Sequence, residues 1–314
     1  MTAASIYTTN GDNWLLNRSY KAVTDYDEPF YMMFGIGQTT PTKADTSIEI
    51  PIPISVGTVN DDGSNTLTGS SGGDNSTDNI VIFKQGANLT DVTAQNLIGN
   101  DTSVSKVWTI ADLSSAGTVV SSTDYESLWF YVLDAAALAK FALTGTALSI
   151  KFRTSGDGST LYYEMAYETG DLVVGWNWIK SWPTIVSGLT QGAGGAPSGT
   201  IDEFVITVTT NNAADEFTAA TDATAELVYD LLRGYVATDL VQEFESDYPS
   251  FNTTLKTVKV RCKIAVTECN GFDIGEMGVL TKDVVPILLT HDVFTPESKD
   301  SDSEFRMNNT DGVQ

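Results

Sequence analysis

Short runs in which every second residue is apolar or β-branched are the main pattern along this chain. The alternation is clear in the segments 47–56, 147–152, 161–168, 203–210 and 254–266. Successive side chains of a β-strand point to opposite faces, so a strand buried on one face produces this pattern. Ser, Thr, Gly, Asn and Asp separate the runs, as turn residues do between strands. The pattern predicts an all-β protein.

Helical periodicity is weak by comparison. Two short helices are predicted, at 134–143 and 237–245. No segment of 20–50 residues recurs along the chain, so the sequence does not indicate a solenoid or a propeller.

One stretch, NDDGSNTLTGSSGGDNSTDN at 60–79, is of low complexity. Its Asn, Asp, Gly and Ser residues favour an exposed loop, and we predict a polar linker at 63–75. The carboxylates between Asp61 and Asp78 could alternatively bind calcium, although the spacing of an EF-hand is missing. The sequence calls for no cofactor, and a structural calcium ion stays open.

Motifs near the two ends of the chain complete each other. Near the start stands the segment PFYMMFGIGQTTPTKADTSIEIPIPI at 29–54, and near the end stand 254–283 and 287–308. The motif residues are Gly35, Gly37, Pro41, Asp45, Thr46, Asn270, Gly271, Ile274, Glu276, Gly278, Phe294, Pro296 and Lys299. Together they resemble a β-sandwich module of tailed-phage tail-fibre, baseplate and head-fibre proteins.

That resemblance implies one β-sandwich attachment domain built from residues 1–62 and 237–314. Asn270-Gly271 is the favoured pair for a type I′ turn, so we expect a structural turn there between two paired strands. Insertions are tolerated at exposed loop tips, which is why a second domain can interrupt the first.

The segment 76–236 carries the second set of motifs. They are Gly175, Trp176 and Asn177, then Ile201, Asp202, Phe204, Ile206 and Val208, and finally Tyr229, Asp230, Leu231 and Arg233. Their order is similar to concanavalin-like and laminin-G-like jelly rolls, including carbohydrate-binding modules. Leu231 stands where that family commonly has a second Asp, which weakens any implied calcium role at this position.

Aromatic residues in this segment are the candidate ligand contacts. Trp176 and Trp178 lie two positions apart and therefore share one face of a strand, while Asn177 faces the other side. Sugars stack on exposed aromatic rings, so we predict glycan binding by Trp176, Trp178 and Trp182. Packing in the core is the competing interpretation for at least one of these faces.

Charge and rare residues narrow the function classes. The chain has 17 Lys and Arg against 41 Asp and Glu, a formal charge of −24, which disfavours nucleic-acid binding. No apolar run approaches the roughly 20 residues of a membrane span, so we expect no membrane insertion. A single histidine, His291, and two cysteines fit neither a zinc site nor a catalytic triad, and His291 is expected to be satisfied or solvated at the surface.

The leading hypothesis is therefore a structural protein of a tailed-phage particle rather than an enzyme. It would dock through its split domain to other virion proteins of the tail fibre, baseplate, neck or head fibre, and project the lectin-like domain. We expect a homo-oligomer, with a trimer favoured, in virions assembled in the host cytoplasm. A receptor-binding adhesin for host-surface glycan is the alternative, and a glycan depolymerase is a third.

Overall fold

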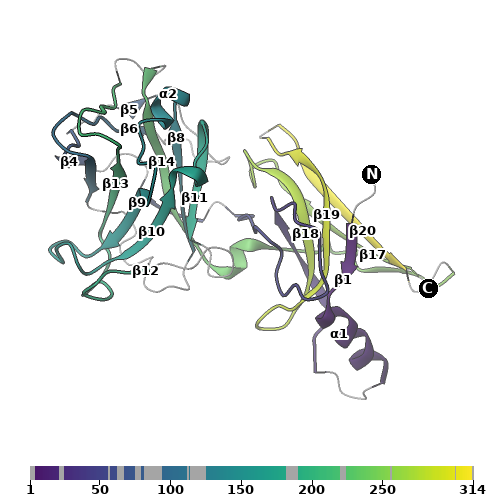
Figure 1. The fold of residues 1–314 in the computed structure, drawn as a ribbon. Coiled ribbons are helices and arrows are strands. Elements are labelled where there is room, and N and C mark those ends of the chain that lie inside the picture. Colours follow the sequence, from purple (N-terminus) through teal and green to yellow (C-terminus); the bar gives the residue numbers. More distant parts are fainter. Residues whose placement is uncertain are drawn as a thin grey trace. The chain divides into compact units, whose positions relative to one another are not determined.

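The structure is a computed structural model in which strands far outnumber helices. It describes the whole chain except residues 1–3, 21–24, 56, 62–66, 75–78, 81–93, 112, 114–124, 182–189, 220–223, 255–256, 301 and 313–314. The predicted all-β fold is confirmed. The chain divides into two compact units (Figure 1). Unit 1 comprises the described residues of Met1–Val56 and Val236–Gln314, and unit 2 those of Gly57–Gln85 and Leu89–Tyr235.

Unit 1 contains a five-stranded antiparallel sheet in the order β1-β19-β18-β2-β15. Its strands are β1 (Ala4–Tyr7), β2 (Pro29–Gly35), β15 (Val241–Glu243), β18 (Asp273–Thr281) and β19 (Leu288–Ser298). Strands from the start of the chain pair directly with strands from its end, β2 with β18 and β1 with β19. The terminal parts of the chain therefore form one sheet.

A second, three-stranded sheet completes unit 1 in the order β16-β17-β20. Its strands are β16 (Ser250–Asn252), β17 (Thr257–Ile264) and β20 (Phe305–Gly312). The two sheets meet where the rings of Phe34 on β2 and Phe305 on β20 pack edge to face at 6.2 Å. Strand β17 buries every second residue along its C-terminal half, as its alternating sequence predicts.

The long helix of unit 1 was not predicted. Helix α1 (Thr9–Tyr20) follows β1 and lies at one end of the unit (Figure 1). The hydroxyl of Thr8 accepts a hydrogen bond from the backbone N–H of Gly11 at 3.1 Å and so caps the helix. A side chain at Gly11 would collide with the carbonyl oxygen of Leu289, so glycine lets the helix dock closely against β19. This helix is set by a cap and a close approach rather than by an apolar stripe.

The two predicted helices are shorter than expected. In unit 2, only α2 (Ala135–Leu138) forms within 134–143, and the Asp134 side chain caps it. Within 237–245, a 3-10 turn, η3 (Ala237–Leu240), leads directly into β15. Among the described residues, no helix has the length and apolar character needed to cross a membrane.

Unit 2 contains two six-stranded sheets. The first has the order β12-β10-β9-β13-β7-β4 and consists of β4 (Leu67–Ser71), β7 (Ser105–Ile110), β9 (Thr146–Arg153), β10 (Tyr163–Glu168), β12 (Thr190–Gln191) and β13 (Glu203–Thr209). The second has the order β11-β8-β14-β6-β5, with β3 also paired to β14. Its strands are β3 (Thr58–Asp61), β5 (Asn79–Ile80), β6 (Ala94–Asn96), β8 (Tyr125–Val132), β11 (Gly175–Ser181) and β14 (Leu227–Tyr235).

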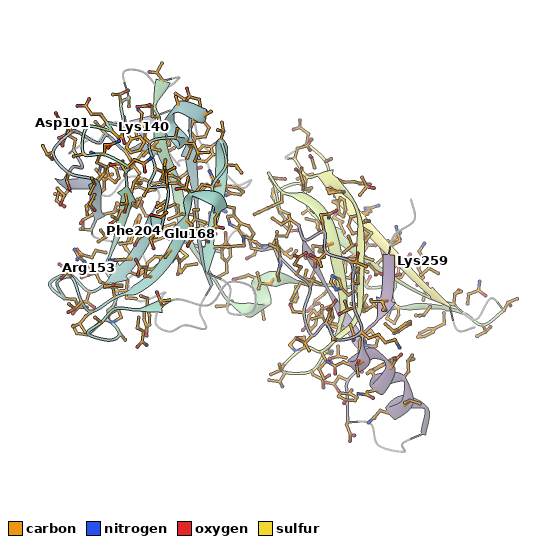
Figure 2. The ribbon with its side chains drawn as sticks, in the orientation of Figure 1. Asp101, Lys140, Arg153, Glu168, Phe204 and Lys259 are labelled. Atoms are coloured by element: carbon orange, nitrogen blue, oxygen red, sulfur yellow. The ribbon has the colours of Figure 1, made fainter. Side chains whose placement is uncertain are left out.

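The core of unit 2 lies between these two sheets. Phe204 on β13 and Tyr229 on β14 meet edge to face at 5.8 Å and are fully buried (Figure 2). The same cluster includes Trp108, Leu128, Phe130, Phe141, Leu148, Ile150, Phe152, Ile179, Ile206 and Leu232. The alternating runs at 147–152 and 203–210 supply one wall of this core, as the sequence pattern predicts. Unit 2 is therefore a β-sandwich with side chains from both sheets interdigitating.

The stretch 63–75 differs from the polar linker predicted there. Residues 67–71 form β4, which pairs with β7, and Leu67 is buried. A Cβ at Gly73 would collide with the backbone of Val107 on β7, and a Cβ at Gly69 would collide with the backbone of Gly73 and Asp74, where the chain folds back on itself. The glycines that suggested a flexible linker therefore serve packing. The residues 62–66 on its N-terminal side lie outside the described part of the chain.

The segment 47–56 also departs from its predicted strand. Its apolar residues Ile48, Ile52 and Ile54 are buried, but its backbone pairs only at the isolated bridge between Gly35 and Pro51. Pro51 and Pro53 have no backbone N–H, so neither can donate the hydrogen bond that a strand ladder requires. The alternation therefore correctly indicates burial here and wrongly indicates a strand.

Asn270 and Gly271 lie in a turn, but that turn is not of type I′. Gly271 has a positive φ of 84°, and the other positive φ belongs to Cys269 at 55°, not to Asn270. The strands on either side, β17 and β18, belong to different sheets, so no hairpin forms. The Asn270 side chain instead donates to the carbonyl of Val266 at 2.9 Å and accepts from the buried Lys299 ammonium at 2.8 Å.

Candidate functional site

Four aromatic side chains lie on the outer face of the second sheet of unit 2. Trp176 and Trp178 on β11 stand directly opposite Tyr131 and Trp129 on β8. Residues paired across strands share a face, and the alternate residues Asn177 and Ile179 lie on the buried side with Phe130. The predicted common orientation of Trp176 and Trp178 therefore agrees with the register. We call Trp129, Tyr131, Trp176 and Trp178 the aromatic face.

The aromatic face consists of two ring pairs. The rings of Trp129 and Trp178 are stacked, with centroids 6.2 Å apart and an interplanar angle of 28°. Those of Tyr131 and Trp176 lie 5.1 Å apart with a tilt of 52°. All four side chains are only half-buried, unlike the fully buried rings of the sandwich core. The pairs hold one another in place and still leave ring surface in contact with solvent.

Asn177 fixes the turn that leads into β11. Its side-chain oxygen accepts a hydrogen bond from the backbone of Val173 at 2.7 Å, and its amide donates to the carbonyls of Val173 and Gly175. Gly175 has a φ of 96°, a conformation that favours glycine. The Gly-Trp-Asn motif is thus a local device that aims the first tryptophan outward.

The far end of β11 is tied to the other sheet of the sandwich. The hydroxyl of Tyr167 on β10 donates to the carbonyl of Lys180 at 2.8 Å and accepts from its N–H at 2.9 Å. Burial raises the pKa of Tyr167 to about 12, so the hydroxyl stays protonated at neutral pH. Both ends of the strand that carries the two tryptophans are therefore held.

Polar residues continue the aromatic face toward this end of the strand. Lys180 lies opposite Ser127 on β8, and Ser127 lies opposite Arg233 on β14. The Lys180 ammonium stands 4.5 Å from the centroid of the Trp178 ring. Burial lowers the pKa of Lys180 to about 8. The third predicted glycan residue, Trp182, lies outside the described part of the chain.

This arrangement suits a flat, partly apolar and hydroxylated ligand. Ring faces that are half-exposed and rigidly paired offer large contact area at low entropic cost. Polar groups at one end can orient what stacks on them.

The histidine and its partners form the second notable cluster, in unit 1. His291 on β19 is buried, with Nδ1 at 2.6 Å from the Asp45 carboxylate and Nε2 at 2.9 Å from the Glu276 carboxylate. We call these three residues the histidine cluster. The expectation of a satisfied histidine agrees with this geometry, whereas the expectation of a surface position is wrong, because three distant segments enclose the ring.

Glu276 on β18 is the hub of the histidine cluster. Its carboxylate is fully buried and accepts backbone hydrogen bonds from Gly37 at 3.0 Å, from Ile50 at 3.1 Å and from Glu49. A Cβ at Gly35 or Gly37 would lie 2.5 Å from this carboxylate. The glycines and the glutamate of the two terminal motifs thus meet at one point.

Opposing effects set the charges in the histidine cluster. Burial alone would lower the pKa of His291, but hydrogen bonds and negative charge from Glu276 and Asp45 raise it above its ordinary value. For Asp45, burial acts to raise the pKa, yet hydrogen bonds from Thr42 and His291 lower it overall. The two carboxylates therefore favour the protonated form of His291. Because both ring nitrogens face carboxylates, the geometry is that of a structural tie.

The remaining candidates for chemistry are buried structural groups. Burial raises the pKa of Cys262 to about 12 and that of Cys269 further, so neither thiol is activated. The ammonium of Lys106 in unit 2 donates to the carbonyls of Ser103 and Ala213, and also to that of Asn100. Within the described ranges, no group of three His, Cys, Asp or Glu side chains could hold a metal ion. In the tract considered for calcium, Asp61 is buried against the Tyr229 hydroxyl, while 62–66 and 75–78 lie outside those ranges.

Comparisons with known proteins add little to this geometry. Neither the protein-family models nor the curated protein sequences give a match to the chain. One matching solved structure comes from work on the structural basis for the promiscuous specificity of carbohydrate-binding modules of the β-sandwich superfamily. It is 13% identical, covers 69% of this chain and 89% of its own, and has a TM-score of 0.32. At that TM-score the likeness carries no argument, so the fold and site rest on this chain's own residues.

Replacing Glu276 by Gln should destabilise unit 1 by about 3–5 kcal/mol, the range for breaking a buried ionic contact. The glutamine amide would place an N–H donor against backbone N–H groups. It would also remove the negative charge that faces the His291 ring. Calorimetric unfolding measures the loss. Glu297→Gln is the matched control, because Glu297 is exposed on the neighbouring strand β19. Equal stability of the two variants would contradict the role given to Glu276.

The histidine cluster should also make stability depend on pH. A raised pKa means that the contribution of His291 is complete below its ordinary value of 6.5 and is lost as the pH rises through the higher folded pKa. The lowered pKa of Asp45 adds a contribution that is present above 3.8 and is lost as the pH falls below it. The stability difference between the native chain and His291→Gln, followed by calorimetry, should shrink from pH 6 upward. A constant difference up to pH 9 would exclude the charged tie.

Proposed function

We propose that the chain is a glycan-binding attachment component of a tailed-phage particle. In this proposal unit 2 contacts host-surface glycan through the aromatic face, and unit 1 connects the chain to other virion proteins. The observation that carries the glycan half is the two partly exposed ring pairs on β8 and β11, on the side of the sheet opposite the apolar core.

Packing accounts for part of this arrangement, because the rings of Tyr131 and Trp176 lie against a small buried cluster of Ala94, Ala225 and Val228. The sandwich core is already filled by the rings of Phe130, Phe152, Phe204 and Tyr229, among others, from the facing sides of the two sheets. Apolar groups that remain at a surface commonly mark an interaction site. Stacking on sugar rings uses such aromatic faces without requiring a deep pocket. The competing role of core packing applies to Asn177 and Ile179 and in part to Trp176, whereas Trp178 is only partly buried and is stacked with Trp129.

Support for the attachment half comes from the terminal motifs. The blocks 29–54 and 254–299, which resemble a phage attachment module, supply the adjacent strands β2 and β18 of one sheet. Their glycines and glutamate converge in the histidine cluster. A homo-oligomer, with a trimer favoured, and a virion location remain part of the proposal.

An array of bacterial and other glycans tests the first half. The native chain should bind a defined set, and Trp178→Ala should weaken that binding by about tenfold or more, as loss of a central tryptophan contact does. Tyr162→Ala is the control, because Tyr162 is a half-buried ring beside the other sheet, in contact with Lys151. No binding by the native chain would reduce the proposal to an architectural role. Release of reducing ends from a bound polysaccharide would instead identify a depolymerase.

Antibody labelling of intact particles tests the second half. Antibodies raised against unit 2 should decorate one structural class of site, such as a fibre tip, baseplate, neck or head fibre, in electron micrographs. Antibodies against unit 1 should label the same site only after the particle is disrupted, because docking would cover that unit. Absence of both labels from purified particles would contradict a virion role.

A further inference from the structure

Beside its aromatic rings, the outer face of the second sheet carries two cations, Lys180 and Arg233, and the buried Asp230, in a chain whose net charge is −24. Lys180 and Arg233 occupy one cross-strand row on either side of Ser127. Neighbouring strands lie about 4.8 Å apart, so the two α-carbons are separated by about 10 Å. A single anionic group above Ser127 could therefore face both cations.

Lys180 is held in place without a counter-charge. Its ammonium lies 4.5 Å from the Trp178 ring centroid, and no ion pair to it is formed by any carboxylate in the described part of the chain. By contrast, Lys151, which stands over the Tyr162 ring on the other sheet, lies 3.8 Å from the carboxylate of Glu164. A lysine on an aromatic ring is thus neutralised on one sheet and not on the other.

Arg233 provides a second, independent observation at the same row. The residue is only 7% exposed, yet its Nε and Nη2 atoms have no hydrogen-bond partner among the described residues. Buried guanidinium donors are normally satisfied, and those left open favour an anionic acceptor. The hydroxyl of Tyr235 interacts with both Arg233 and Ser127, so the row is a polar patch and not an isolated charge.

We propose that the aromatic face recognises an acidic saccharide, whose carboxylate, sulfate or phosphate group binds at the row of Lys180, Ser127 and Arg233. The sugar ring stacks on Trp178 while its anionic group reaches past the end of that ring. This inference rests on the glycan-binding function proposed above and specifies its ligand class.

The charge of Lys180 should couple binding to pH. Charged groups on the strands packed beside it are Arg233 and Asp230 on β14 and Glu126 on β8. Burial lowers the pKa of Lys180 to about 8, so the free protein begins to lose this charge just above neutral pH. A bound anion favours the protonated amine and raises its pKa, so binding takes up a proton above pH 8. Affinity should be constant below pH 7 and should fall as the pH rises toward 9.

Three variants on the same glycan array test the acidic-ligand proposal. The native chain should bind glycans that carry uronic acid, sialic acid, sulfate or phosphate, and Lys180→Met should weaken this binding about tenfold, as loss of a charge-assisted contact does. Lys180→Arg should retain the binding and lose its decline up to pH 9, because arginine stays charged. Lys151→Met is the matched control and should change nothing.

The outcomes separate this inference from the function beneath it. If the native chain binds only neutral glycans and Trp178→Ala abolishes that binding, the proposal of an acidic ligand is wrong and the proposal of glycan binding stands. No glycan binding at all would overturn both. For the strongest acidic ligand, removal of its anionic group, by reduction of a carboxylate or by cleavage of a sulfate or phosphate ester, should cost the native chain about as much affinity as Lys180→Met does. Unchanged affinity after that removal would also refute the inference.

Discussion

The buried carboxylate of Glu276 is the contact on which unit 1 depends. It lies on β18, near the end of the chain, and accepts three backbone hydrogen bonds from Gly37, Glu49 and Ile50, near the start. A buried charge is costly unless it is fully paired, so removing any of these donors exposes that cost. His291 supplies the compensating positive charge on the same carboxylate. The two ends of the chain are thus joined by an interaction that stabilises unit 1 only when all of its partners are present.

This contact explains where sequence patterns predicted the fold and where they failed. Alternation predicted β9, β10, β13 and β17 because in those segments burial on one face coincides with pairing in a ladder. In 47–56 the two are separate: Ile48 and Ile52 are buried, but the backbone N–H groups of Glu49 and Ile50 donate to the Glu276 side chain and not to a neighbouring strand. Helix α1 was missed for a related reason, since Thr8 and Gly11 determine it through a cap and a close approach. Contacts between distant segments leave no local period.

The candidate site divides in the same way. A spacing of two residues was enough to predict that Trp176 and Trp178 share a face, because that depends on one strand only. The row of Lys180, Ser127 and Arg233 could not be predicted, because it depends on the register of three strands. A bulge between Asp230 and Arg233 shifts that register by one residue, so counting along β14 would assign Arg233 to the core. The surroundings of His291 likewise come from three segments that no local motif connects.

Buried polar groups have different roles in the two units, and the difference is relevant to the function of unit 2. In unit 1, the charged groups of the histidine cluster pair with one another and stabilise the fold. In unit 2, the core is complete without the outer face, and Arg233 keeps buried donors that no described residue accepts. Arg233 also interacts with the Tyr235 hydroxyl, but its Nε and Nη2 donors lose hydration that no described residue repays. Such a group is retained more readily where a ligand supplies the missing acceptor, and the rings of Trp129 and Trp178 beside it supply the surface on which that ligand can lie.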